Sequence, residues 1–375
     1  MAVLFKDRFD YESLYKLALE IKAVYDGFPV EEFLEATMDG MWDGLEFKRR
    51  IMQISLNLGK YLPADYKEAI SVIDRVIGNY DICFDGFVAF FPVFVELYGQ
   101  DEENWDVSMA ALERYTPYAS AEFAVRSFIL NDEGRMMAQM EAWARHDNEH
   151  VRRLASEGCR PRLPWGQALP SFQKDPSPIL PILEMLKADP SPYVRKSVAN
   201  NLNDISKTHP DLVVSIAKDW YGKNKHTDWV VKHGCRTLLK KGNRDVLGLF
   251  GFADTGCVEV NGFSLEASSV PLGGNLTFFF EIAAKKATKV RLEYGIDYVK
   301  SNGRRNRKIF QISELTFKEN GKKAYTKTHS FADTSTRKHY PGIHSVTLIV
   351  NGGERGTLDF EVFVADVTRP EYGIS

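Results

Sequence analysis

The sequence has few cysteines and no long hydrophobic run. These two features argue against a disulfide-rich or zinc-binding protein and against a membrane protein. The 375 residues contain four cysteines, Cys83, Cys159, Cys235 and Cys257, without the paired spacing of a zinc site or a disulfide framework. The longest apolar stretch, Phe87–Val95, is shorter than the roughly 18 residues of a membrane span. The charged N-terminus lacks the apolar core of a signal peptide. We therefore expect a cytoplasmic protein with reduced thiols, no metal and no membrane contact.

The familiar catalytic motifs are missing as well. The sequence contains no GxGxxG fingerprint, no P-loop, no HExxH and no GxSxG. Its eight histidines are scattered, so a His/Cys nucleophilic site has no support. No cofactor is expected, and any chemistry must come from residues outside these motifs.

The charge is close to zero only in total. Lysine and arginine number 48 and aspartate and glutamate 51, for a formal charge of −3. Residues 1–144 carry 13 basic and 26 acidic side chains, residues 145–250 carry 18 and 11, and residues 251–375 carry 17 and 14. The basic remainder of the chain favours a polyanionic partner. The alternative is chance variation in the charge of helical surfaces.

From the start to about residue 250 the apolar residues recur at three- and four-residue steps, as in amphipathic helices. No run of alternating β-branched residues interrupts them. This part of the chain is therefore predicted to be all-α. The expected helical stretches are 12–24, 31–58, 65–78, 86–98, 105–114, 119–130 and 134–146.

A short unit recurs within the helical region. The segment 147–155 resembles 189–199, 227–235 is a weaker third copy, and 121–126 is a candidate earlier one. Val151, Val194 and Val231 take equivalent places in the three copies, 43 and 37 residues apart. That period, with a turn before a helix that opens Val-Arg or Val-Lys, indicates a HEAT-like helical array. The second helices carry the basic residues, so the inner surface of the array should be basic.

Beyond residue 250 the pattern changes to short alternating strands separated by Gly, Asn and Pro turn signals. We predict an immunoglobulin-like sandwich without the Cys…Trp…Cys signature of antibody domains. The expected organisation is a HEAT-like solenoid over residues 1–250 and a β-sandwich over residues 251–375. The seven predicted strands start near residues 257, 275, 289, 308, 323, 342 and 357.

The segment 148–165, NEHVRRLASEGCRPRLPW, carries the densest set of charged groups. A proline-fixed loop with further cations and an indole follows its helix, which suits a cationic ligand held against a polyanionic backbone. The alternative is a solvated face with i,i+4 ion pairs of a few tenths of a kcal/mol each. On a helical wheel one face holds Glu149, Arg152, Arg153, Ser156, Glu157 and Arg160, and the other holds Val151, Leu154, Ala155 and Gly158.

VRRLASEGCRPRLPW, followed by DPSPYVRKSVANNLNDISKTHPDLV, resembles the bacterial alkylpurine DNA glycosylase family AlkC, in the subgroup with a C-terminal immunoglobulin-like domain. The resemblance is clear over roughly residues 100–250. It implies a monofunctional DNA repair enzyme that hydrolyses the N-glycosidic bond of 3-methyladenine and 3-methylcytosine. It also implies double-stranded DNA containing alkylated bases as the partner. We expect a monomer that is associated with the bacterial nucleoid when bound to DNA. A non-catalytic HEAT-repeat scaffold that binds nucleic acid or protein is the alternative.

The resemblance implies catalytic roles for Glu122, Glu157 and Trp165. Asp204, one repeat further on, is a third carboxylate that is a candidate for the same groove on its position alone. The two glutamates would flank the deoxyribose, and Trp165 would contact the lesion or its sugar. Each has a structural alternative. Glu122 could favour a helix N-terminus through the dipole, Trp165 could be a core residue at a repeat junction, and Asp204 could be a solvated or capping residue.

Basic residues of the second helices and the adjacent loop are candidates for phosphate contacts. A hairpin-like loop of the sandwich, residues 300–308, has five basic residues and no acidic one. It is predicted to be a second clamp on the duplex, with a simple exposed turn as the alternative. The candidate DNA-binding residues are Arg152, Arg153, Arg160, Arg162, Arg195, Lys196, Lys232, Arg304, Arg305 and Arg307.

Overall fold

The computed structural model describes residues 5–82, 87–252, 256–334 and 337–364. The chain forms two compact units, Met1–Gly234 and Cys235–Ser375. In the described parts of the chain, none of the helices is both long enough and apolar enough to cross a membrane. Cys159, Cys235 and Cys257 are buried free thiols, and Cys83 lies outside the described residues.

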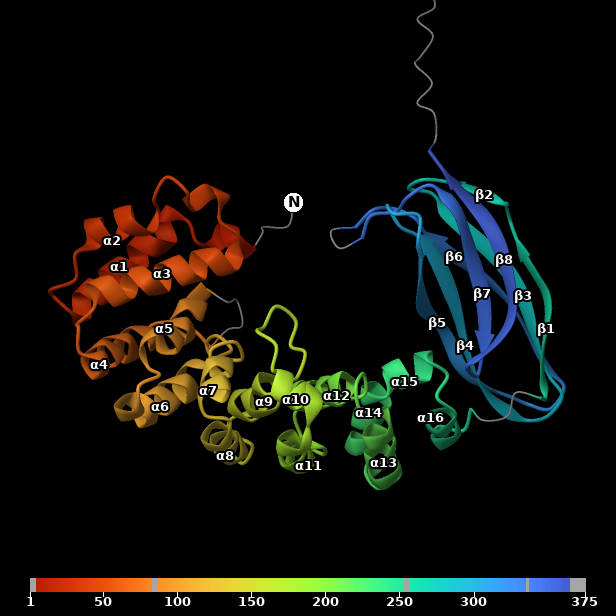
Figure 1. Ribbon diagram of the computed structural model, residues 1–375, viewed down its shortest axis with the longest axis horizontal. Coiled ribbons are helices and arrows are strands. Elements are labelled where there is room, and N and C mark those ends of the chain that lie inside the picture. The colour runs from red at the N-terminus through yellow and green to blue at the C-terminus, as the bar shows by residue number, and fades with distance from the viewer. Residues whose placement is uncertain (1–4, 83–86, 253–255, 335–336, 365–375) are drawn as a thin grey trace, which may run out of the picture. The chain divides into compact units, whose positions relative to one another are not determined.

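The first unit is all-α, as predicted. Its helices pack in two rows, with α3 against α5, α9 against α12 and α12 against α14 in one row, while α8 and α11 contact α9 from the other. Figure 1 shows α9, α12 and α14 in one row along α8, α11 and α13. The helices are α1 Tyr11–Val24, α2 Val30–Thr37, α3 Phe47–Tyr61, α4 Tyr66–Ile77, α5 Phe90–Tyr98, α6 Trp105–Tyr115, α7 Val125–Asn131, α8 Glu133–Trp143, α9 Glu149–Gly158, α10 Pro170–Lys174, α11 Leu180–Leu186, α12 Pro192–Ile205, α13 Pro210–Trp220 and α14 Lys225–Gly234.

The repeat prediction is confirmed by the starts of three helices. The Asn148 side chain accepts from the His150 amide at the start of α9, Ser191 does the same for α12, and Asn224 for α14. Such N-caps satisfy amides that lack a partner within the helix. The three equivalent valines are buried: Val151, Val194 and Val231 are at most 1% exposed.

Two predicted helices are wrong in detail. The stretch 31–58 is divided into α2 and α3, since the Asp39 side chain accepts from the Met41 amide at 3.0 Å in a local turn that ends the helical path. The stretch 119–130 is helical only from Val125, because residues 121–124 form a turn. Glu122 therefore lies in a turn before α7 rather than on a helix.

The second unit begins with α15 Arg236–Lys240 and α16 Arg244–Leu249 and continues as a β-sandwich. A three-stranded sheet has the order β1-β3-β6 and a five-stranded sheet the order β2-β8-β7-β4-β5. The predicted immunoglobulin-like fold is confirmed, with the short β2 as a strand that the sequence pattern missed. The strands are β1 Val258–Leu265, β2 Ser269–Pro271, β3 Asn275–Ala284, β4 Thr288–Val299, β5 Arg305–Phe317, β6 Gly321–Ser330, β7 Gly342–Val350 and β8 Gly353–Phe363.

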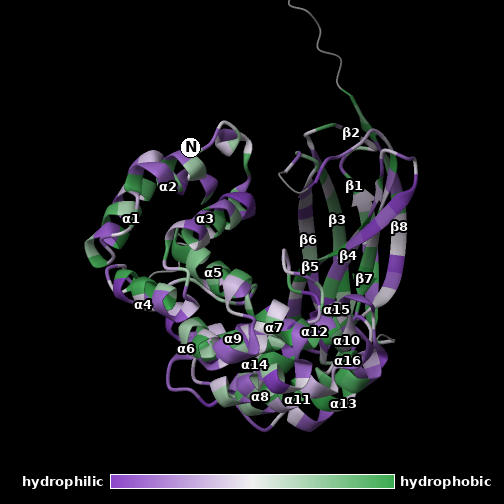
Figure 2. Cartoon of the chain, turned by 60° about the vertical axis from the view of Figure 1, so that its left-hand side comes forward, coloured by the Kyte–Doolittle hydropathy of each residue, from purple (hydrophilic) through white to green (hydrophobic). Residues whose placement is uncertain are grey.

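The sandwich core lies between the two sheets and consists of their inward-facing apolar side chains. Phe278 and Ile282 of β3 and Leu292 and Ile296 of β4 are fully buried members, and Figure 2 shows the hydrophobic colouring along β3 and β7. Helix α16 packs against the sandwich: an added Cβ on Gly352 would lie 2.7 Å from Leu247 Cδ1. The boundary between the compact units therefore precedes the change from helix to strand.

Candidate active site

Three carboxylates and two guanidinium groups alternate inside the helical unit, and we call Glu122, Arg153, Glu157, Arg160 and Asp204 the carboxylate–arginine cluster. Arg153 Nη1 donates to Glu122, and its Nη2 lies 3.4 Å from Glu157 Oε1. Arg160 donates from Nη1 to Glu157 Oε1 at 2.6 Å and from Nε to Asp204 Oδ2 at 2.9 Å. Glu157 is the central member, since it faces both arginines.

Packing of α9 on α12 brings the cluster together. The Ser156 hydroxyl meets Ser197 Oγ at 2.7 Å, and Asn201 Nδ2 donates to the Ser156 carbonyl at 2.9 Å. This polar seam lays the last turn of α12, with Asp204, beside the C-terminal end of α9, with Glu157. Glu157 is 5% exposed and Asp204 2%. The alternative of a solvated Asp204 is therefore wrong. The alternative of a solvated helix face holds only in part, since Glu149 is exposed and Arg153 forms the i,i+4 pair with Glu157.

The cluster is held by charge. Burial lowers the pKa of Arg153, but the charges of Glu122 and Glu157 raise it more, so the pKa lies above its usual value. The pKa of Arg160 is raised in the same way, since Glu157 and Asp204 outweigh the effect of burial. Lys207 adds a donor to Asp204 Oδ1 at 2.9 Å. The arrangement fixes three carboxylates in a partly dehydrated environment, where electrostatic effects are strong.

A loop follows the cluster and carries an exposed indole; we call residues 160–169 the Trp165 loop. It stands out between α9 and α10 in Figure 1. The Trp165 side chain is 79% exposed, so the alternative of a core residue is wrong. Its φ of 63° is in the left-handed region, which residues other than glycine seldom occupy. The Gly166 amide closes the turn by donating to the Leu163 carbonyl at 3.1 Å.

Comparisons with known proteins find relatives of both units. Residues 101–240 match the family described as DNA alkylation repair enzyme, and residues 259–364 match the C-terminal immunoglobulin-like domain of the uncharacterised protein YhaZ. The chain is 44% identical over 358 residues to YhaZ of Bacillus subtilis (strain 168), which covers 95% of this chain and 99% of that protein. The structure of Pseudomonas fluorescens alkylpurine DNA glycosylase AlkC bound to DNA containing an abasic site analog superposes with a TM-score of 0.91, at 38% identity, over 96% of this chain and 100% of that one.

The chain belongs to the AlkC family of DNA alkylation repair enzymes. The predicted combination of a helical repeat unit and an immunoglobulin-like unit is thereby confirmed as that of the family.

The predicted phosphate-binding residues of this AlkC-family chain fall into two groups. Arg153 and Arg160 are in the cluster, and Arg152 pairs with Asp189 at 2.7 Å, so a phosphate would compete with their carboxylate partners. Arg195 is half-buried and donates to the carbonyls of Asp189 and Pro190. The exposed members of the helical unit are Arg162, Lys196 and Lys232.

The basic segment of the sandwich is only partly a loop. The turn between β4 and β5 comprises 300–304, where the Lys300 amide donates to the Arg304 carbonyl at 2.9 Å. Arg305 and Arg307 lie on β5 instead, and Arg307 pairs with Asp297 at 2.8 Å and with Glu354. The prediction of a loop over residues 300–308 is wrong in extent, because the segment from Arg305 onward belongs to β5, whose register sets Arg307 opposite Asp297.

Two cations that contact the Trp165 loop were missed from the sequence. Arg126 of α7 is 1% exposed and donates to carbonyls at both ends of the loop. Lys48 of α3 donates to the Trp165 carbonyl. The only indication of Arg126 in the sequence was weak: it is the last residue of the candidate earliest repeat copy, 121–126. Lys48 had none, since 117 residues separate it from its acceptor.

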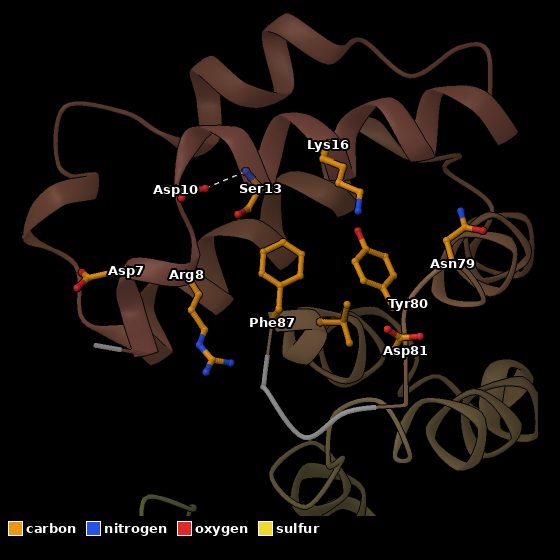
Figure 3. A pocket seen from close by; sticks show the side chains of 10 residues that line it. Asp7, Arg8, Asp10, Ser13, Lys16, Asn79, Tyr80, Asp81 and Phe87 are labelled. Atoms are coloured by element: carbon orange, nitrogen blue, oxygen red, sulfur yellow. Dashed lines mark hydrogen bonds between the residues drawn. The ribbon is translucent and has the colours of Figure 1, made fainter. Parts of the chain in front are cut away.

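The part of the chain that the structure describes contains no group of three or more metal-ligating side chains. It does contain a hollow among the N-terminal helices, lined by charges of both signs (Figure 3). Lys16 and Tyr80 point toward one another there. The hollow shares no residue with the carboxylate–arginine cluster; its lining includes Asp7, Arg8, Asp10, Ser13, Lys16, Asn79, Tyr80, Asp81, Phe87 and Val88.

Proposed function

We propose that this protein is a monofunctional DNA glycosylase that removes cationic N3-alkylated bases, 3-methyladenine and 3-methylcytosine, from double-stranded DNA. The observation that carries the proposal is the position of Glu157. It is a buried carboxylate between two arginines and lies in the same repeat as the exposed Trp165. The similar P. fluorescens enzyme is an alkylpurine DNA glycosylase that binds DNA, which supports the same substrate class here.

Excision of such a base does not require a general acid. An N3-alkylated base already carries positive charge and leaves as a neutral molecule, so protonation of the leaving group is unnecessary. The transition state places positive charge on the deoxyribose, as in other glycosyl transfers. A fixed negative charge near the sugar stabilises that state more than the ground state. Neutral bases are spared because they are poor leaving groups without an acid.

The carboxylate–arginine cluster suits this task. Glu157 and Glu122 are assigned to the two sides of the deoxyribose, where they stabilise the oxocarbenium-like sugar and orient the attacking water. The shared arginine, Arg153, fixes both carboxylates and sets the distance between them. Asp204 is assigned a supporting role, because its oxygens already accept from Arg160 and Lys207.

Trp165 is assigned to the lesion or its sugar. An exposed indole can meet a cationic base through its face, a contact of roughly 0.5–2 kcal/mol. Because the side chain is 79% exposed, little protein packing has to be broken before it meets DNA. The contact would add to the electrostatic preference for cationic bases.

Binding to the DNA backbone is assigned mainly to the exposed cations Arg162, Lys196, Lys232 and Arg304. The sandwich would act as a second clamp on the duplex through the 300–304 turn. Such contacts make affinity depend steeply on salt. We propose that the protein acts as a monomer.

The test is release of methylated bases. Double-stranded DNA treated with a methylating agent is incubated with the protein, and free bases are resolved by chromatography. We expect 3-methyladenine and 3-methylcytosine in the supernatant, and abasic strands that break only after alkali. DNA binding without release of either base would contradict the proposal and favour a non-catalytic scaffold.

A further inference from the structure

We propose that Arg126 and Lys48 are positioning residues that hold the Trp165 loop in its active geometry, Arg126 at the base and Lys48 at the tip. The inference rests on the proposed function for its kinetic readout, whereas its structural readout is independent of activity. Both residues bind this loop through its backbone carbonyls. Each acts through the indole that they position.

Arg126 joins the two ends of the loop. Its Nη1 donates to the carbonyls of Gly158 at 2.7 Å and Arg160 at 3.0 Å, and its Nε donates to the Gln167 carbonyl at 2.5 Å. All three acceptors are backbone atoms at or near the two ends of the loop. Burial lowers the pKa of Arg126 to about 10. A buried cation that binds carbonyls fixes backbone geometry at a desolvation cost, which is expected where exact placement matters.

Lys48 holds the tip from a distant helix. It lies in the first turn of α3, and its ammonium group donates to the Trp165 carbonyl. The same ammonium group is 3.9 Å from the centre of the Phe123 ring. Phe123 follows Glu122 in the chain, so Lys48 contacts both the indole loop and the turn that carries a catalytic candidate.

The exposure of Trp165 explains why backbone anchors are needed. A side chain that is 79% exposed contributes little packing to hold its own loop. The left-handed backbone at Trp165 persists only where its surroundings impose it. Besides the buried side chains of Leu163 and Leu169, the surroundings include polar contacts to carbonyls. These come from Arg126 at the ends, Lys48 at Trp165, and Gln173 Nε2, which donates to the Pro161 carbonyl at 3.0 Å.

The main variant is Lys48→Met, which keeps the length of the side chain and removes its charge. Lys48→Arg tests rescue, because a guanidinium can still donate to the carbonyl. Lys60→Met is the matched control, since Lys60 is an exposed lysine of the same helix whose contact is with the neighbouring Tyr61. Single-turnover excision should fall roughly threefold to tenfold in Lys48→Met, because misplaced reacting groups slow the chemical step. Lys48→Arg should recover most of the rate, and Lys60→Met should match the wild type.

A double-mutant cycle separates positioning from general stability. If Lys48 acts through the indole, Lys48→Met should have no further effect on excision once Trp165 is replaced by alanine. Losses of rate that multiply in the double variant would overturn the inference. Arg126→Lys forms the second test of the loop base, in which excision should fall while the protein remains folded.

The structural readout uses 5-fluorotryptophan and ¹⁹F NMR on the free protein. The Trp165 resonance is assigned by its loss in Trp165→Phe. We expect Lys48→Met to shift or broaden this resonance and to leave the other five tryptophans unchanged. An unchanged Trp165 resonance would overturn the inference even if the enzyme is active. An inactive wild type with a Trp165 resonance that responds to Lys48→Met would instead contradict the proposed function and leave the positioning intact.

Discussion

Both units of this protein bury an arginine among carboxylates, but the surroundings of the two sites differ. In the sandwich, Arg291 of β4 donates to Glu293 at 2.6 Å and to Glu314 of β5. Glu293 is fully buried and Arg291 is 3% exposed. In the helical unit, Glu157 is 5% exposed and lies near a loop with an exposed indole. Burial of an ion pair therefore does not by itself mark a site.

The two sites differ in the elements that hold their charged groups. Arg291 and Glu293 are two residues apart on one strand and Glu314 is the register partner of Arg291, so the sheet holds all three groups together. The cluster of the helical unit joins a turn before α7, the helix α9 and the end of α12. Repeat packing, rather than one element, sets its geometry.

The largest expected effect comes from neutralising one buried glutamate in each unit, Glu157 and Glu293. Glu157→Gln should reduce excision roughly 100- to 1,000-fold, the effect of losing one preorganised electrostatic group, with DNA affinity nearly unchanged. The matched variant Glu293→Gln should leave the excision rate of folded protein unchanged and instead cost stability, by about 3–5 kcal/mol for a broken buried pair. Single-turnover kinetics and thermal unfolding of both variants provide the measurement. Normal excision by Glu157→Gln would make Glu157 structural.

The second prediction concerns acid stability and sets the sandwich apart from the helical unit. His329 is buried between the hydroxyls of Tyr294 and Tyr298, at 2.9 and 2.6 Å, and burial lowers its pKa to about 4. A histidine with a lowered pKa binds more protons when unfolded, so its contribution to stability is complete above pH 6.5 and is lost as the pH falls toward 4. The resulting loss in the free energy of unfolding is about 3 kcal/mol.

We therefore expect unfolding of the sandwich to become easier between pH 6.5 and pH 4. The ¹⁹F signals of fluorinated tyrosines report on it, since Tyr294 and Tyr298 are in this unit. His329→Gln should flatten the pH dependence, because the titrating group is removed. A pH dependence that is the same in His329→Gln would assign the effect to other groups, such as His339 and His344, whose pKa values burial also lowers.

Much of the fold could be predicted from the sequence, because periodicity reports burial. The valines at 151, 194 and 231 identified the repeat, and alternating residues identified the strands of the sandwich. The break between α2 and α3 was missed because an apolar period continues across a turn that depends on one Asx contact at Asp39. The strand β2, with three residues, is too short to show a period.

The site was only partly predictable. Spacing placed Glu157 and Arg153 on one helical face, but it could not show that this face is buried, since burial depends on α12 packing against it. The contacts of Lys48 and Arg126 with the Trp165 loop were missed, because residues far apart in sequence leave no common pattern. The carboxylate partner of Arg307 could not be predicted either, because it depends on the register between β4 and β5 and the segment around Arg307 contains only basic charges.

The third prediction compares two exposed tryptophans of the helical unit. Trp165→Ala should reduce excision roughly 3- to 30-fold, the equivalent of one cation–π contact. Its thermal stability should be unchanged, because the side chain is 79% exposed. Trp229→Ala is the control: Trp229 is 45% exposed and stacks on His233 at 5.1 Å, outside the cluster. Equal losses of excision at saturating DNA in both variants would remove the special role of Trp165.

The smallest expected effect compares two arginines of the sandwich. Arg304 is exposed in the turn between β4 and β5, whereas Arg307 already has Asp297 and Glu354 as partners. If the turn contacts a phosphate, Arg304→Ala should lower the slope of log affinity against log salt by about 1. Arg307→Ala should alter this slope less, since its charge is neutralised within the sandwich. Titration of labelled duplex at several salt concentrations measures both slopes, and an unchanged slope for Arg304→Ala would place the clamp elsewhere.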